Sequence, residues 1–312
     1  MNSLSPSRRR GLLLAAAVAL VFAVALFGYN LWRRGHPTAE NYRALVSAFT
    51  EGVVALEVSD DEHALPSLLS ATQIAPGEPA GWADLGIFYL RHNNPAAARS
   101  AIEKASELAP DNAQILALLG LLETQSGKFD ASVTAYQKAV KNDPGNLRAR
   151  YALGQAQQQL GGPDADELAQ KQLQAIADAA PENLFATINL AEAAAKSGNG
   201  ALVRQMTARL AARSSGWTPE LREALKAAQK AVAGGDLRSA VPLLQGLENL
   251  LGQYSPYHSD LIKIQGDTSV IGVPVTRFLS QPNPPVTPAA PDMQLKFATQ
   301  PLVVPGSTGH WT

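Results

Sequence analysis

The stretch that decides the fold is PAGWADLGIFYLRHNNPAAARSAIEKASELAPDN, residues 79–112, followed directly by AQILALLGLLETQSGKFDASVTAYQKAVKNDPGN, residues 113–146. Small, bulky and helix-breaking residues recur at the same places in both segments, 34 positions apart. A period of this length is typical of arrays built from one helix–turn–helix unit per repeat. The matched positions are Leu85-Gly86 with Leu119-Gly120, Ala98 with Ser132, Ile102 with Tyr136, Ala105 with Ala139, and Pro110 with Pro144.

The residue types indicate how each unit folds. We expect Gly86 and Gly120 to lie where two paired helices approach most closely, because a larger side chain would separate them. The small Ala98 and Ser132 are expected to meet those glycines from the second helix. A proline follows each second helix and ends it, since proline lacks an N–H and clashes with the preceding turn. Each unit is therefore predicted to be a pair of helices joined by a short turn.

With Trp82 and Tyr89 on the first helix, the pattern resembles the tetratricopeptide repeat (TPR). The resemblance covers residues 45–252, and it implies an all-α TPR superhelix. One weaker copy precedes residue 79 and three follow residue 146, so we expect about six helix pairs. The first of the later copies needs three extra residues, which we place in the turn around residues 161–163.

The N-terminal residues predict a membrane anchor. After a short basic tail, residues 1–10, residues 11–32 contain no charged side chain and are long enough to cross a bilayer as a helix. Arginines flank both ends, and residues 33–44 are predicted to be a linker. A cleavable signal peptide is the alternative, because Ala23, Val24 and Ala25 resemble a cleavage site. The expected location is the bacterial inner membrane, single-pass, with the TPR body in the periplasm.

The first helix of each pair should line the concave face of a TPR array, where partners bind. Projection from the repeat register gives a face that is apolar and carries amide groups, suited to docking a peptide, a helix or a subunit of another protein. The same residues could instead pack against each other or against the chain's own tail. The candidate partner-binding residues are Phe49, Val53, Ile87, Leu90, Leu121, Gln125, Tyr151, Gln155, Gln158, Phe185 and Asn189.

The composition argues against chemistry. The chain has no cysteine, its five histidines show no metal-ligand spacing, and no nucleophile elbow occurs. We therefore predict no catalytic residues, no cofactor, no metal and no enzyme activity. Outside the first 37 residues the chain has 21 basic and 27 acidic side chains, and this acidic balance argues against nucleic acid as a partner.

Residues 253–312 are predicted to be an extended, proline-rich tail, because QPNPPVTPAAP at 281–291 cannot form a helix. Simple disorder is the alternative. A TPR region followed by such a stretch resembles the layout of proteins in which a Pro-rich spacer leads to an FG-GAP-type propeller. Here the resemblance covers only residues 270–300, and no propeller repeats follow in this sequence.

These features predict a membrane-anchored TPR scaffold that mediates protein–protein interaction in the assembly or stabilisation of a membrane-associated complex. Two alternatives stay open. One is a periplasmic chaperone-like factor that holds a client, similar to the TPR subunits of cytochrome c maturation. The other is a fixed structural subunit of a membrane complex. Repeat motifs specify the fold and leave these roles undistinguished.

Overall fold

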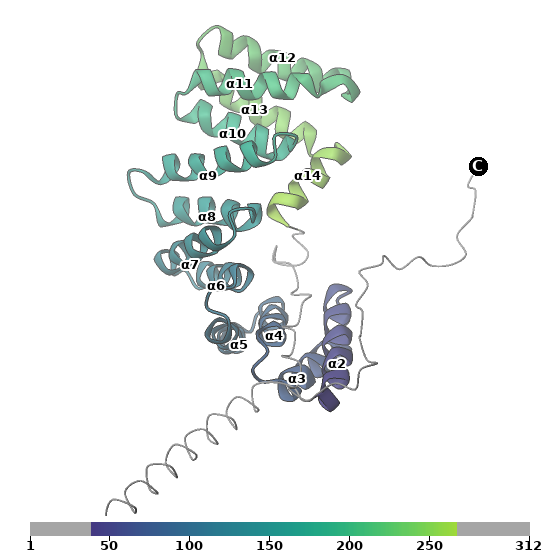
Figure 1. Ribbon diagram of the computed structural model, residues 1–312. Coiled ribbons are helices and arrows are strands. Elements are labelled where there is room, and N and C mark those ends of the chain that lie inside the picture. The colour runs from purple at the N-terminus through teal and green to yellow at the C-terminus, as the bar shows by residue number, and fades with distance from the viewer. Residues whose placement is uncertain (1–38, 267–312) are drawn as a thin grey trace, which may run out of the picture. The chain divides into compact units, whose positions relative to one another are not determined.

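A computed structural model describes residues 39–266 of the chain (Figure 1). Within this range it contains thirteen α-helices, one 3₁₀ turn (Ser214–Gly216) and no strand. The helices are α2 (Ala39–Glu57), α3 (Asp61–Ile74), α4 (Pro79–Arg91), α5 (Pro95–Leu108), α6 (Ala113–Gln125), α7 (Phe129–Asn142), α8 (Leu147–Leu160), α9 (Ala165–Ala179), α10 (Leu184–Lys196), α11 (Gly200–Ala212), α12 (Pro219–Ala233), α13 (Leu237–Leu251) and α14 (Ser255–Gln265). The predicted anchor at 11–32 and the proline-rich segment at 281–291 lie outside the described residues.

Twelve of these helices form the six predicted pairs, from α2 with α3 to α12 with α13. Helices α4, α6 and α8 begin 34 residues apart, and α10 begins 37 residues after α8. The three extra residues are not all in the turn, as the sequence analysis proposed. Compared with α6 and α7, helices α8 and α9 are each one residue longer, and the turn between them has four residues instead of three. An insertion spread in this way keeps the following pair in the stack.

Asparagine side chains begin many of the helices, a signal that the sequence analysis did not use. Asn112, Asn146 and Asn183 each occupy the N-cap of a first helix, and their side-chain oxygens accept hydrogen bonds from backbone N–H groups of the first turn. Asn94 and Asn199 do the same for α5 and α11. The N–H groups of a first turn have no partner inside their own helix, so each asparagine cap stabilises its helix by about 1 kcal/mol.

The glycines of the repeat lie at the close approaches, as predicted, but their neighbours differ from those expected. A Cβ at Gly86 would lie 2.5 Å from Cγ1 of Ile102, and one at Gly120 would lie 2.8 Å from two ring carbons of Tyr136. The bulky residue four positions after the expected small one therefore fills the space over each glycine. Ser132 still reaches Gly120, because its hydroxyl donates a hydrogen bond to the Gly120 carbonyl at 3.0 Å.

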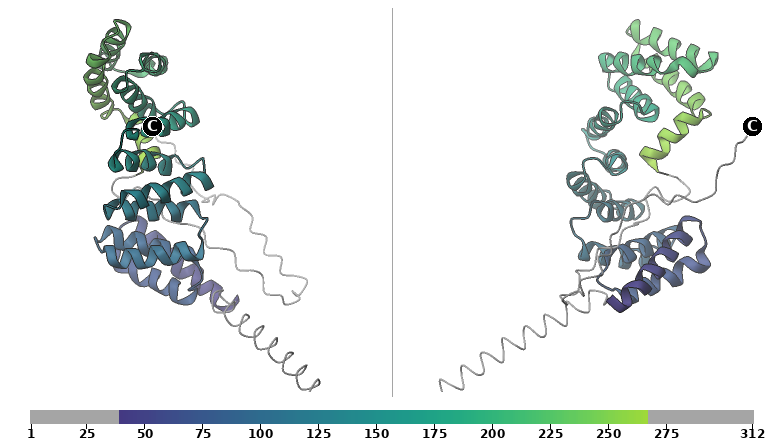
Figure 2. Two further views of the ribbon diagram at one scale, coloured as in Figure 1. Left: turned by 90° about the vertical axis from the view of Figure 1, so that its left-hand side faces the viewer. Right: turned by 45° about the vertical axis from the view of Figure 1, so that its right-hand side comes forward.

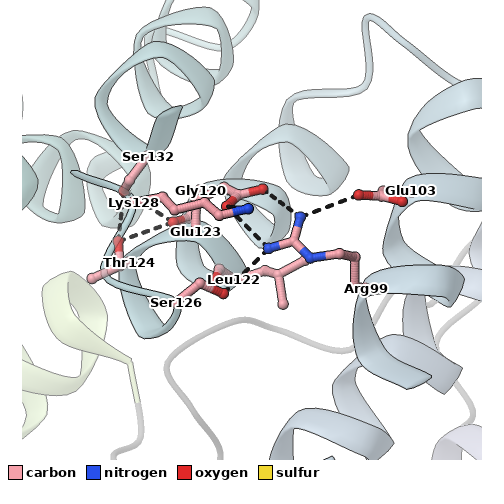
Figure 3. A network of polar contacts seen from close by, with 9 residues as sticks. All are labelled: Arg99, Glu103, Gly120, Leu122, Glu123, Thr124, Ser126, Lys128 and Ser132. Carbon is pink, nitrogen blue, oxygen red and sulfur yellow. Dashed lines mark hydrogen bonds and ion pairs between the residues drawn. The ribbon is translucent and has the colours of Figure 1, made fainter. Parts of the chain in front are cut away.

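An ion pair joins one repeat to the next (Figure 3). Arg99 on α5 donates to both carboxylate oxygens of Glu123 on α6, at 2.7 and 3.1 Å, and also to the hydroxyl of Ser126. The Arg99 guanidinium lowers the pKa of the Glu123 carboxyl, which is 7% exposed. A two-pronged contact of this kind fixes geometry as well as charge. It holds the second pair against the third.

The described helices extend beyond both predicted ends of the array. Helix α2 begins at Ala39, inside the predicted linker 33–44. At the other end, the prediction of an extended tail from residue 253 is wrong for residues 255–265, which form α14. The sequence PYHSDLIKI has too few turns to show a helical period by itself, and its helix forms against other parts of the array. No helix among residues 39–266 has the length and apolarity needed to span a bilayer.

Candidate partner-binding surface

Helix α14 departs from the pairing of the array and packs against α10 and α8. It is the yellow-green helix in the right-hand view of Figure 2. A short turn, residues 252–254, connects it to α13. Tyr257, Asp260 and Ile264 are its buried side chains, with exposed fractions of 3%, 8% and 1%. Their spacing of i, i+3 and i+7 is that of a helix that inserts one face into a receiving surface. We call the parts of α8, α10 and α13 beneath α14 the docking surface.

Asp260 makes the most specific contact with the docking surface. Its Oδ2 accepts a hydrogen bond from the backbone N–H of Leu184 at 2.9 Å, in the first turn of α10. Its backbone carbonyl accepts a second bond from the side-chain amide of Asn183, also at 2.9 Å. A carboxylate at this position meets the positive end of the α10 dipole and satisfies an otherwise unpaired N–H group. The start of α10 is therefore completed by a residue 76 positions away in the chain.

Helix α8 contacts the C-terminal half of α14. The hydroxyl of Tyr151 accepts hydrogen bonds from Gln265 at 3.0 Å and from Gln155 at 3.1 Å. Arg148 donates to the carbonyl of Ile262 at 3.4 Å. Burial raises the pKa of the Tyr151 phenol, so this hydroxyl stays protonated at neutral pH. These polar contacts orient α14 along α8, and the apolar contacts supply the attraction.

Three aromatic rings continue from α8 across α10 to α14. The ring centroids of Tyr151 and Phe185 are 5.5 Å apart, and those of Phe185 and Tyr257 are 6.0 Å apart. Separations of this size are favourable for edge-to-face and tilted rings. Phe185, 2% exposed, therefore receives one aromatic side chain from each side.

A pair of carboxyl groups lies below Tyr257. Glu248 on α13 accepts hydrogen bonds from the hydroxyl of Tyr257 at 2.6 Å and from the amide of Asn189 at 2.9 Å. Burial, and after it the hydrogen bond with Glu248, raise the pKa of the Glu192 carboxyl to about 7. Two close carboxyl groups share a proton more readily than they both ionise. Glu192 on α10 therefore keeps its proton up to near neutral pH beside Glu248 of α13.

A hollow of about 230 Å³ borders the docking surface between α8, α9 and α10. It is lined by side-chain amides, by apolar side chains such as Leu173 and Ala169, and by charged groups, among them Lys196 and the Glu192 carboxyl. We call it the glutamine hollow, after Gln155, Gln158, Gln170 and Gln172. Amides can both donate and accept, so a lining of this kind suits the peptide groups of a bound backbone.

The profile of the tetratricopeptide-repeat family matches residues 83–146 and 119–169, a range that runs from within α4 into the start of α9. The matched segments are the repeats whose glycine contacts and caps are described above. Residues 83–169 of the chain carry tetratricopeptide repeats.

One solved structure supports the helical-repeat fold, and two others show a weaker likeness. The structure of PilF from Pseudomonas aeruginosa is similar at a TM-score of 0.52 and 18% identity, covering 70% of this chain and 97% of that one. MamA from Desulfovibrio magneticus RS-1 follows at 0.47 and 16%, covering 56% and 98%. YrrB, described as a TPR protein with an unusual peptide-binding site, has a TM-score of 0.42 and 18% identity, covering 52% and 82%. No curated protein sequence matches the chain. At 18% identity the likeness to PilF concerns the fold alone.

The predicted partner-binding residues divide between two regions of the TPR array. Four of them, on α2 and α4, are buried in the apolar core that α2 to α6 share: Phe49, Val53, Ile87 and Leu90. Leu121 is half-buried against the same core, and Gln125 is exposed. On α8 and α10, Gln155 and Gln158 are exposed at the glutamine hollow, Tyr151 and Asn189 are half-buried, and Phe185 is buried under α14.

The structure thus brings Tyr151, Gln155, Gln158, Phe185 and Asn189 together at one place in the TPR array. The chain's own C-terminal helix covers part of that place, which was the alternative left open from the sequence. Residues missed by the sequence analysis are Tyr257 and Asp260 of α14, and Glu192 with its partner Glu248. Glu192 was hidden because the hydrogen bond to α13 spans 56 residues of sequence. The described residues contain no cluster of three or more histidine or acidic side chains able to hold a metal ion.

Proposed function

We propose that this chain is a membrane-anchored, non-catalytic TPR scaffold that holds a segment of another protein at the docking surface and the glutamine hollow. The observation that carries the proposal is the seating of α14. A helix already lies on this surface, with an aromatic side chain, a carboxylate and an aliphatic side chain as its anchors. The glutamine hollow beside it offers amides to a further stretch of backbone.

The membrane part of the proposal rests on residues 11–32, which are uncharged and long enough to span a bilayer. A short basic N-terminus followed by an exported body would put the TPR array in the periplasm of a bacterium, next to the inner membrane. There it would assemble or stabilise a membrane-associated complex. Its partners would be proteins, with no nucleic acid and no cofactor.

Two related roles differ in how long the partner stays. A chaperone-like factor that resembles the TPR subunits of cytochrome c maturation would hold a client briefly, below one copy per scaffold. A fixed structural subunit would remain with its neighbours at equal copy number. The exposed amides at the hollow favour the role in which partners exchange, because such surfaces bind peptide segments without the large apolar interface of a permanent complex.

The test is purification of the full chain from gently solubilised membranes in three forms: wild type, Gln155→Arg and Gln137→Arg. Gln155 lines the hollow, whereas Gln137 is an equally exposed glutamine on α7, away from it. Wild type and Gln137→Arg should recover the same partner, and Gln155→Arg should recover about tenfold less, equal to about 1.4 kcal/mol. Equal recovery by all three forms, or recovery of the chain alone, would contradict the proposal.

A further inference from the structure

Helix α14 has the features of a bound ligand more than those of an array helix. Each of the other twelve α-helices between residues 39 and 266 belongs to a pair, whereas α14 crosses over to α8 and α10. It is buried along one face only, and the opposite face, with Ser255, His258, Ser259 and Lys263, is exposed. A helix of eleven residues is too short to be stable alone in water, so its order depends on the surface beneath it.

The docking surface selects a particular chemistry. The start of α10 presents the Leu184 N–H to an acidic side chain, and it presents the Asn183 amide to the backbone carbonyl of the same residue. On one side of that acid, Phe185 and Glu248 receive a tyrosine ring and its hydroxyl. On the other side the core receives an aliphatic side chain, Ile264 in α14. An apolar helix without the acid would leave the Leu184 N–H without a hydrogen-bond partner. The free energy lost in this way makes the surface selective for a helix that carries the acid.

We propose that α14 occupies in cis the site for a partner helix, which carries an aromatic residue, an acid three positions later and an aliphatic residue four positions after that. This inference rests on the proposed function, since it names the segment that the scaffold binds. The partner must displace α14 to enter. Because α14 is tethered by three residues, its local concentration is of the order of millimolar, so the closed form outcompetes a dilute partner.

The first test measures binding of a fluorescent synthetic peptide, residues 253–266 of this sequence, to the purified full chain in detergent. Two variants of the chain are compared with wild type. Tyr257→Ser with Ile264→Ser removes two anchors of α14 and leaves the docking surface unchanged. His258→Ser with Ser259→Ala changes only exposed positions of α14 and is the matched control.

The anchor variant should bind the peptide at least about tenfold more tightly than wild type, because the competing helix is released. The control should bind like wild type. A peptide with Asp260→Asn should bind the anchor variant about tenfold more weakly than the native peptide does, because it loses the charge at the start of α10. Equal affinities for wild type and a folded anchor variant, or for both peptides, would overturn the proposal.

A second measurement leaves every anchor of α14 in place. The chain has no cysteine, so Ser259→Cys on the exposed face of α14 accepts a single fluorophore. Excess unlabelled peptide should lower the fluorescence anisotropy of that label as α14 leaves the surface. Unchanged anisotropy at saturating peptide would overturn the proposal. Both tests use only the purified chain and the peptide, whereas the proposed function is tested by partner recovery with Gln155→Arg. The failure of one proposal can therefore be told apart from the failure of the other.

Discussion

Replacement of Gly120 by alanine is a direct test of how the TPR pairs are packed. The added Cβ would lie 2.8 Å from Cδ1 and Cε1 and 2.9 Å from Cγ of Tyr136. All three atoms belong to one rigid ring, and Tyr136 is only 4% exposed, so the ring has little room to withdraw. Either the ring leaves its rotamer or α6 and α7 move apart, and overpacking of this kind costs about 1–3 kcal/mol.

Helix propensity acts in the opposite direction, because alanine in a helix is favoured over glycine by about 1 kcal/mol. Gly246→Ala isolates this second effect. Gly246 lies inside α13, is exposed, and has no heavy atom within 4 Å of the position that its Cβ would take. Gly246→Ala should therefore stabilise the array by about 1 kcal/mol, and Gly120→Ala should destabilise it by about 0–2 kcal/mol.

The assay is urea unfolding followed by far-UV circular dichroism, with thermal unfolding as a second probe. The two variants should differ by about 1–3 kcal/mol, and each kcal/mol corresponds to about 2–4 °C in Tm for an array of this size. If Gly120→Ala stabilised the chain as much as Gly246→Ala does, the contact between Gly120 and Tyr136 would be refuted, together with the repeat register that places it.

Two further perturbations have signs that follow from the charges. Glu192 holds its proton up to about pH 7 in the folded chain but releases it near pH 4.5 when unfolded, so its stabilising contribution is complete below about pH 4.5 and is lost as pH rises through 7. Between about pH 5 and 8 the free energy of unfolding of wild type should therefore fall by up to about 3 kcal/mol relative to that of Glu192→Gln. Urea midpoints at each pH measure it. Parallel pH profiles of the two proteins would contradict the raised pKa of Glu192. Arg99→Met leaves the Glu123 carboxylate buried without its main partner and should cost about 1–3 kcal/mol at pH 7. Because Arg99 lowers the pKa of Glu123, that cost should shrink as the pH falls below 4.5, and a cost independent of pH would refute the ion pair.

The repetitive part of the fold was predictable because its residues act locally and recur. The two strong repeats each have a glycine on the first helix and a proline after the second. Extending their 34-residue period along the chain was enough to predict the six helix pairs. Ser132 contacts Gly120 as predicted, but the side chain over the Cβ position of Gly120 is that of Tyr136, one helical turn later, which spacing alone does not reveal. An alignment at period 34 could not divide the three added residues between α8, α9 and their turn.

The partner-binding surface was predictable only in part. The repeat register placed Tyr151, Gln155 and Asn189 on first helices, and the structure brings them together. The repeat register could not place α14, because this helix has no counterpart in the repeat. Its anchors contact α10 across more than 70 residues of sequence. The candidates on α2 and α4 are buried because they belong to the apolar core that α2 to α6 share, and the repeat register alone does not distinguish such core positions from an open surface.

The central claim is that partners bind this TPR array at the surface of α8 and α10. A photo-crosslinking amino acid placed at Gln158, on the glutamine hollow, tests it in cells that express the full chain. The same residue at Gln137, exposed on α7, is the matched control. Irradiation should give a discrete heavier adduct from position 158 and none from position 137. No adduct from position 158, or equal adducts from both positions, would contradict the claim.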